Sequence, residues 1–180
     1  MKRTLTFLFF IVCTVSVFAS TTEDKLNIAI SSIASAIEDI SDSKSSIVKI
    51  PVTSELSKEL VEEVMKSVAT SMGIRSVGIL PISEMYELQT DKGQKFHKMF
   101  QYLDLADAMT LISYSTKLST IYPIRIHLAE DFDGQLWLIA DDIQPIIRRH
   151  QTAPKYIQDI LYRAKEIVKT IMHSGATGKP

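Results

Sequence analysis

The sequence has 180 residues, with 20 lysines and arginines, 21 aspartates and glutamates, one cysteine and six glycines. A net charge near zero without a basic stripe argues against nucleic acid as a partner. The single thiol excludes an intramolecular disulfide framework, and the few glycines form no phosphate-binding loop.

The N-terminus has the pattern of a secretory signal peptide. Two basic residues precede a mostly apolar run, residues 5–18, and the small-residue pattern VFA closes it at Ala19. The run is shorter than the roughly 20 apolar residues of a membrane-spanning helix, and no charged stop-transfer flank follows it. We therefore assign residues 1–19 as a signal peptide, with cleavage after Ser20 as the alternative. We expect an exported protein of the bacterial periplasm that is not stably inserted in the membrane.

Cleavage would change the chemistry that is open to the chain. It removes two of the 20 basic residues, leaving 18 against 21 acidic ones, and it removes Cys13, the only cysteine. The mature chain is then mildly acidic and has no thiol for a catalytic cysteine or a thiolate metal site. Its length is that of one ordinary domain.

Residues 20–45 are predicted to form an N-terminal helix and a linker. Apolar residues recur at helical spacing over 23–40, and the polar break SDSKSS follows at 41–46. The helix either covers one edge of the domain or binds a partner. Residues 46–180 are predicted to form a single α+β domain.

From residue 47 on, the pattern alternates between strands and helices. Strands are predicted in the segments IVKIPV, IRSVGILPI, KFHKMFQYL, TIYPIRIHLAE and GQLWLIA, in chain order. The pair Asp133-Gly134 predicts a hairpin turn between the last two strands.

Three helices are predicted among these strands, over residues 54–73, 104–115 and 154–173. Ser54 and Asp104 are the expected N-cap residues of the first two. Gly73 and Gly175 are expected to end the first and third helices. The third helix has the widest apolar stripe and should lie across the sheet.

This order of elements predicts an antiparallel sheet with helices mainly on one face, an α+β architecture. The opposite face is then solvated, paired with another subunit or used for a ligand. Because the predicted helices leave this face uncovered, we expect a homodimer with two-fold symmetry.

Four segments resemble one known family. MFQYLDLADAM, IYPIRIHLAEDFDGQLWLIADD, IQPIIRRH and IMHSGATGK are similar to the bacterial domain of unknown function 302 (DUF302), over roughly residues 60–178. The resemblance implies a curved antiparallel sheet wrapping a long C-terminal helix, in the TATA-binding-protein-like group of folds, commonly as a dimer. It implies no reaction, although some members resemble accessory proteins of sulfur-oxidising bacteria. Residues 46–180 are thus interpreted as one DUF302-like domain.

The chain departs from that family at two positions. Many members carry cysteines where this sequence has Leu103 and Ile124, the latter in YPIRI. Any thiol chemistry of those cysteines is therefore not expected of this protein.

Strand alternation selects four candidate ligand-binding residues. Arg125 and His127 share one face of their strand, and His97 and Gln101 share one face of theirs. The opposite face of the Arg125 strand belongs under the helices and carries Tyr122, Ile124, Ile126 and Leu128. A guanidinium fork beside an imidazole suits a small anion. The alternative is a solvated face, with ion pairs to residues such as Glu130.

Other chemistry has weaker support in the sequence. The four histidines, at positions 97, 127, 150 and 173, lack the spacing of a zinc site, so we predict no metal and no cofactor. EDFDG at 130–134 is interpreted as an acidic hairpin tip rather than a calcium loop. Trp137 is expected in the core or a dimer interface rather than as a stacking platform.

The sequence therefore predicts a secreted or periplasmic binding or accessory module, for a small anion or a protein partner. No catalytic residue is predicted, because there is no nucleophile with a base and no glycine-framed serine. The alternative is a small enzyme with His127 as general base and Arg125 as anion stabiliser.

Overall fold

The structure is a computed structural model that describes residues 47–179, so the predicted signal peptide and the predicted N-terminal helix lie outside the described residues. The elements of the described part are β1 (Ile47–Pro51), α2 (Lys58–Ser71), β2 (Arg75–Leu80), α3 (Ile82–Thr90), β3 (His97–Leu103), α4 (Leu105–Tyr114), the 3-10 helix η1 (Thr116–Thr120), β4 (Ile124–Glu130), β5 (Leu136–Asp141), α5 (Gln144–Arg149) and α6 (Lys155–Thr177).

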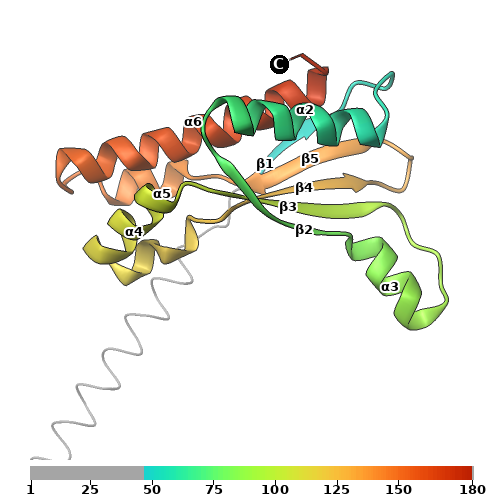
Figure 1. The fold of residues 1–180 in the computed structure, drawn as a ribbon, viewed down its shortest axis with the longest axis horizontal. Coiled ribbons are helices and arrows are strands. Elements are labelled where there is room, and N and C mark those ends of the chain that lie inside the picture. Colours follow the sequence, from blue (N-terminus) through green and yellow to red (C-terminus); the bar gives the residue numbers. More distant parts are fainter. Residues whose placement is uncertain (1–46, 180) are drawn as a thin grey trace, which may run out of the picture. The chain divides into compact units, whose positions relative to one another are not determined.

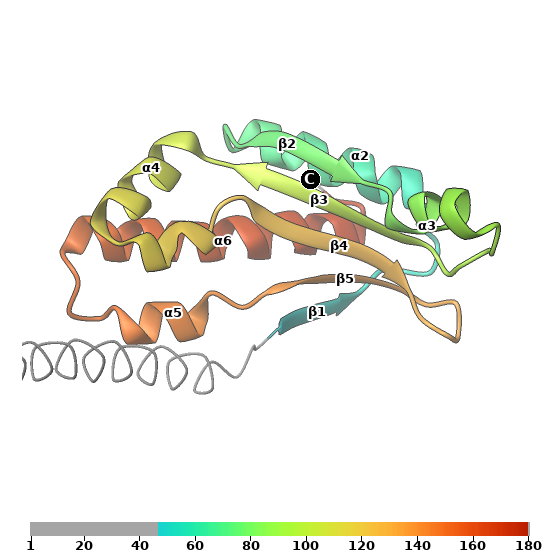
Figure 2. The same cartoon turned by 90° about the horizontal axis from the view of Figure 1, so that it is seen from below.

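Within residues 47–179, five strands form one sheet in the order β1-β5-β4-β3-β2, and every neighbouring pair is antiparallel. Helices α2 and α6 pack against each other on one face of this sheet (Figure 1). In Figure 2 the strands lie in front of α2 and α6, and the other described helices sit at the ends of the sheet. The predicted α+β architecture with a long C-terminal helix is confirmed. We call the face turned away from α2 and α6 the open face.

The core lies between the sheet and these two helices. From α6 it takes the fully or nearly fully buried residues Ile157, Ile160, Leu161, Ala164, Ile167, Val168, Ile171, Met172 and Ala176. The side chains that were expected under the helices are buried, namely Ile124, Ile126 and Leu128 of β4 and Tyr122, which precedes this strand. Alternation therefore identified the correct inner face of this strand. None of the helices in residues 47–179 combines the length and apolar character needed to cross a bilayer.

Gly175 does not end the last helix, so that prediction is wrong. Helix α6 continues to Thr177, and the left-handed residue that follows it is Gly178, with φ of 68°. A Cβ on Gly175 would come within 2.6 Å of Met65 Cγ and 3.1 Å of Leu138 Cδ1. Glycine stands there because α6 approaches α2 and β5 closely, and not because the chain turns.

Helix boundaries show two further differences from the prediction. Helix α2 begins one turn later than expected, because Ser57, not Ser54, is its N-cap and accepts the N–H of Leu60 at 3.2 Å. Helix α3 was not predicted. It follows Pro81 without a side-chain cap, and Leu88 within it is 85% exposed, so its sequence lacks a clear apolar stripe.

Other local signals were correct. Asp104 caps α4 and accepts the N–H of Asp107 at 3.0 Å. Gly134 has φ of 84° in the turn between β4 and β5, which is the conformation that the Asp-Gly pair predicts. The segment IQPIIRRH, noted in the resemblance, contains α5.

Replacing Ile126 by alanine tests the position of the core. Ile126 is fully buried, so Ile126→Ala is expected to lower the free energy of unfolding by about 2–5 kcal/mol. The matched control is Leu88→Ala, because Leu88 is 85% exposed, and it should change stability by about 0.5 kcal/mol or less. Urea unfolding measures both variants. Equal losses in the two variants would contradict this placement of the core.

Candidate functional site

The open face carries all four residues predicted from the sequence. On β3 and β4, the side chains that alternate with the buried ones are half-buried and point away from α2 and α6. The strand register places Met99 opposite His127 and Gln101 opposite Arg125. Sharing a face does not mean sharing a contact, and the four side chains have different partners.

His97 and His127 meet directly. Nε2 of His97 lies 2.9 Å from Nδ1 of His127, and the ring centroids are 5.2 Å apart with the rings tilted by 39°. One nitrogen donates its hydrogen and the other accepts it, and the tautomers of the two rings decide which. Two neutral imidazoles can form this hydrogen bond. Two imidazolium rings cannot, because each facing nitrogen would then carry a hydrogen. We call these two residues the imidazole pair.

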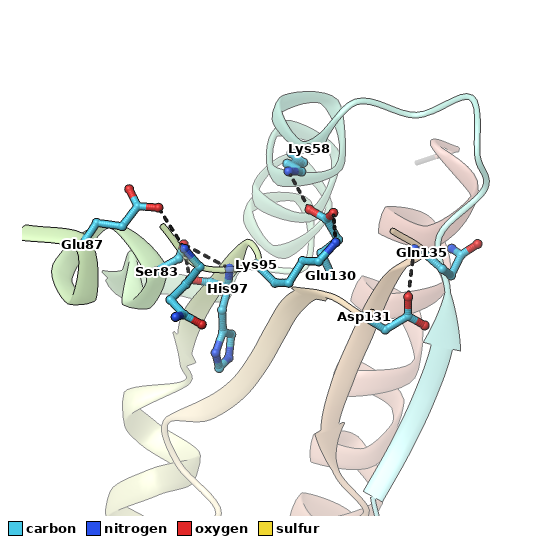
Figure 3. Close-up of polar contacts among 9 residues, drawn as sticks. Lys58, Ser83, Glu87, Lys95, His97, Glu130, Asp131 and Gln135 are labelled. Atoms are coloured by element: carbon cyan, nitrogen blue, oxygen red, sulfur yellow. Dashed lines mark hydrogen bonds and ion pairs between the residues drawn. The ribbon is translucent and has the colours of Figure 1, made fainter. Parts of the chain in front are cut away.

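Helix α3 fixes the backbone that carries His97. The hydroxyl of Ser83 accepts the N–H of His97 at 3.1 Å and donates to its carbonyl at 3.4 Å. Ser83 is buried, so these bonds are shielded from water. Figure 3 shows the imidazole of His97 pointing away from α2, which carries Lys58, and toward the open face. The helix that the sequence did not reveal thus anchors one half of the imidazole pair.

Burial keeps the imidazole pair neutral. It lowers the pKa of His97 from its ordinary value, since removal from water disfavours the charged ring. Burial also lowers the pKa of His127, and the neighbouring His97 and Arg125 lower it further, while Asp141 raises it. The pair is therefore set to gain protons only at a pH below that of an exposed histidine.

Arg125 has an acidic partner on the next strand. Its Nη2 lies 3.0 Å from Oδ2 of Asp141 and 3.5 Å from the carbonyl of Thr120. The side chains of Arg125 and Asp141 are 40% and 62% exposed, so the ion pair is weak and open to exchange. The alternative, a cross-strand ion pair of Arg125, is therefore seen, although its partner is Asp141 and not Glu130. Glu130 instead holds Lys58 at 3.2 Å and Lys95 at 3.4 Å (Figure 3).

Gln101 turns away from the other three candidates. A Cβ on Gly78 of β2 would lie 2.6 Å from Oε1 of Gln101, so this side chain extends over the glycine. The β2–β3 register shifts between Ser76 and Gly78, so that Val77 is not paired with a residue of β3. Gln101 therefore leans toward β2, whereas Arg125 reaches toward β5. The structure brings His97 and His127 together but does not bring Gln101 into contact with Arg125.

Trp137 lies on the open face and not in the core. It stands opposite Ala129 and Pro51 in the sheet and is only half-buried. Its Nε1 donates to Oδ2 of Asp131 at 2.7 Å, and Nζ of Lys49 lies 3.8 Å from the ring centroid. The bond from Trp137 is the main cause that lowers the pKa of Asp131. The predicted core position is wrong, and a dimer interface stays a prediction.

Sequence reasoning also missed a groove beside α2. A groove of about 440 Å³ lies on the helix side of the sheet, and its lining includes Glu59, Glu62, Glu63, Lys66, Glu84, Phe96, Lys98, Phe100 and Tyr102. Lys98 pairs with Glu62 at 2.6 Å inside it. Three glutamates at spacings of three and four on one predicted helix were the available signal.

Comparison with known proteins identifies the fold. The sequence matches no protein-family model and no curated protein. A solved structure, an uncharacterised conserved protein DUF302 from Bacillus stearothermophilus, superposes with a TM-score of 0.58 at 6% sequence identity, over 71% of this chain and 95% of that chain.

This chain has a DUF302-like fold. At such low identity the likeness concerns the fold alone, and it agrees with the architecture that the four sequence segments implied. The DUF302 protein is itself uncharacterised, so the likeness brings no ligand or reaction with it. Any function of the present DUF302-like chain must therefore be argued from its own side chains.

The imidazole pair predicts a pH dependence of stability. The pKa of each histidine is lowered on folding from the ordinary 6.5, so the unfolded chain binds more protons near that pH. The free energy of unfolding should therefore be highest above about pH 6.5 and fall as the pH approaches about 5.

A double variant isolates this contribution in the metal-free protein. His97→Gln with His127→Asn replaces both rings by amides that do not titrate. Urea unfolding at several pH values is expected to show a smaller loss of stability on acidification in this variant than in the wild type. Identical slopes would show that the pair does not couple to folding.

Proposed function

We propose that this chain is an exported, non-catalytic binding module that holds a small oxyanion on the open face of its sheet. One observation supports this best. Arg125 and the imidazole pair occupy neighbouring positions on the one sheet face that α2 and α6 leave uncovered. A guanidinium and imidazole N–H groups are donors that suit carboxylate-like and sulfate-like ligands.

The pairings of these side chains favour binding over catalysis. A general base needs a free lone pair within reach of a substrate proton. Nδ1 of His127 is engaged with His97, and Arg125 is engaged with Asp141. In the enzyme alternative Nε2 of His127 is a base only when Nδ1 carries the shared hydrogen, and Arg125 has to leave Asp141 before it can stabilise an anion. For a binding module, only the weak exposed ion pair has to exchange, since the ligand replaces the carboxylate of Asp141.

The competition between Asp141 and the anion gives a direct test. Asp141→Asn removes the charge that occupies Arg125, so affinity for sulfate, phosphate or thiosulfate should rise, by up to about 5-fold for an exposed pair of this kind. Arg125→Ala should abolish binding. Binding in the wild type should weaken as salt is raised. Calorimetry and the NMR signals of the His127 ring measure these effects.

A matched control separates the site from a general change in charge. Asp159→Asn removes a carboxylate from the exposed Lys155–Asp159 pair on α6 and should leave anion affinity unchanged. If neither wild type nor Asp141→Asn gives a saturable response to the three anions, the face does not serve small anions. A partner protein is then the remaining candidate.

We also propose that the chain forms a symmetric homodimer through the β1–β5 part of the open face, beside Arg125 and the imidazole pair. Apolar side chains on β1 and β5 support this, namely those of Ile47, Trp137 and Ile139. Analytical ultracentrifugation should give about twice the monomer mass, as expected for the commonest closed oligomer. Ile139→Lys should shift the equilibrium toward monomer, while Leu88→Lys, at an 85% exposed position on α3, should not. A single monomeric species at high concentration would refute the dimer.

A further inference from the structure

Met99 completes a triangle with the imidazole pair. It lies two residues from His97 on β3, on the same face, and directly opposite His127 on β4. Side chains that face each other in antiparallel strands have Cβ atoms about 4.5–5.5 Å apart. The thioether of Met99 therefore lies within reach of the ring that His97 contacts.

The nitrogen atoms of the pair are almost at the spacing of two ligands of one metal ion. Nε2 of His97 and Nδ1 of His127 are 2.9 Å apart. Two imidazole nitrogens bound to the same ion at about 2.0 Å each lie about 3.3–3.5 Å apart at tetrahedral or trigonal angles. If the pair opens by about half an ångström and the shared hydrogen moves to the far nitrogen of its own ring, both facing nitrogens present lone pairs to one ion.

We propose that His97, Met99 and His127 bind copper(I). Imidazole and thioether donors suit copper(I), whereas a zinc site usually takes at least three nitrogen, oxygen or thiolate ligands from the protein. Across residues 47–179 there is no group of three or more histidine, cysteine, aspartate or glutamate side chains that could hold a metal ion. The further protein donor that the register places beside the imidazole pair is the sulfur of Met99.

The surroundings favour a soft ion of low charge. His97 stands opposite Ala129, and His127 has Ile139 as its opposite residue on β5. Apolar neighbours limit the access of water, which a strongly hydrated divalent ion would retain. The site goes beyond the proposed anion site because it needs neither Arg125 nor Gln101. Coordination through Nδ1 of His127 also leaves Nε2 of this ring for an anion.

Copper(I) titration under anaerobic conditions tests the proposal. The wild-type protein competes with a chromophoric copper(I) chelator, and X-ray absorption at the copper edge then identifies the ligand atoms. Uptake of one copper(I) per chain with nitrogen and sulfur scatterers is expected. Met99→Leu keeps the volume and apolar character of the side chain. Met99→Leu should remove the sulfur scatterer and weaken copper(I) binding by about 10-fold or more. Loss of a residue that only orients a metal ligand already weakens metal binding by about that factor, so loss of the ligand itself should do at least as much.

Two control variants make the outcome specific. Met109→Leu makes the same change on α4, at a residue that is 57% exposed, and should bind copper(I) as the wild type does. Arg125→Ala should also bind copper(I) normally while it loses the anion response, so the two proposals fail separately. A wild type that takes up no copper(I), or a Met99→Leu variant that binds as tightly with unchanged scatterers, would overturn the copper site.

Discussion

The packing of α6 across the sheet is the constraint on which the rest of the structure depends. Its buried stripe contacts the inner residues of the central strands, among them Ile126, Leu128 and Leu138. Because strand side chains alternate, committing these residues to the core turns His127 and Ile139 to the other face. Gly175 strengthens the constraint, since its lack of a side chain lets α6 approach α2 and β5 closely. The open face is thus a consequence of how the core is built.

Those parts of the fold that local chemistry decides could be predicted from the sequence. The period-two pattern around Ile126 identified the inner face of β4, and Asp104 and Gly134 acted as the cap and turn residues that their types suggest. The failures arose where tertiary packing decides. Gly175 resembles a helix stop, but it is a site of close approach. Helix α3 has no side-chain cap and a very exposed Leu88, so its sequence carries no strong helical signal.

The candidate site shows the same division more sharply. Alternation predicted correctly that His97, Gln101, Arg125 and His127 share a face. It could not predict their contacts, because these depend on the register of β3 against β4. A shift of two residues would keep every side chain on its face and still separate the two imidazoles. The side chains of Gln101 and Arg125 point in different directions. Gln101 extends over Gly78 on β2, and Arg125 pairs with Asp141 on β5. Neither partner is signalled by spacing along the chain.

The open face differs from ordinary surface because its strands are held in a hydrogen-bonded sheet while the contacts between its polar side chains are weak. The backbone of His97 is held by the buried Ser83, and Glu130 at the end of β4 pairs with two lysines (Figure 3). The contacts between the polar side chains of the open face are of a different kind. The Arg125–Asp141 pair is exposed, so breaking it costs little, and the bond within the imidazole pair joins two neutral rings that can turn their lone pairs to a ligand. Binding sites need donors held to within fractions of an ångström by elements that do not move. A rigid sheet with weakly engaged donors meets this requirement, because an incoming ligand displaces side-chain partners without disturbing the packing of α6.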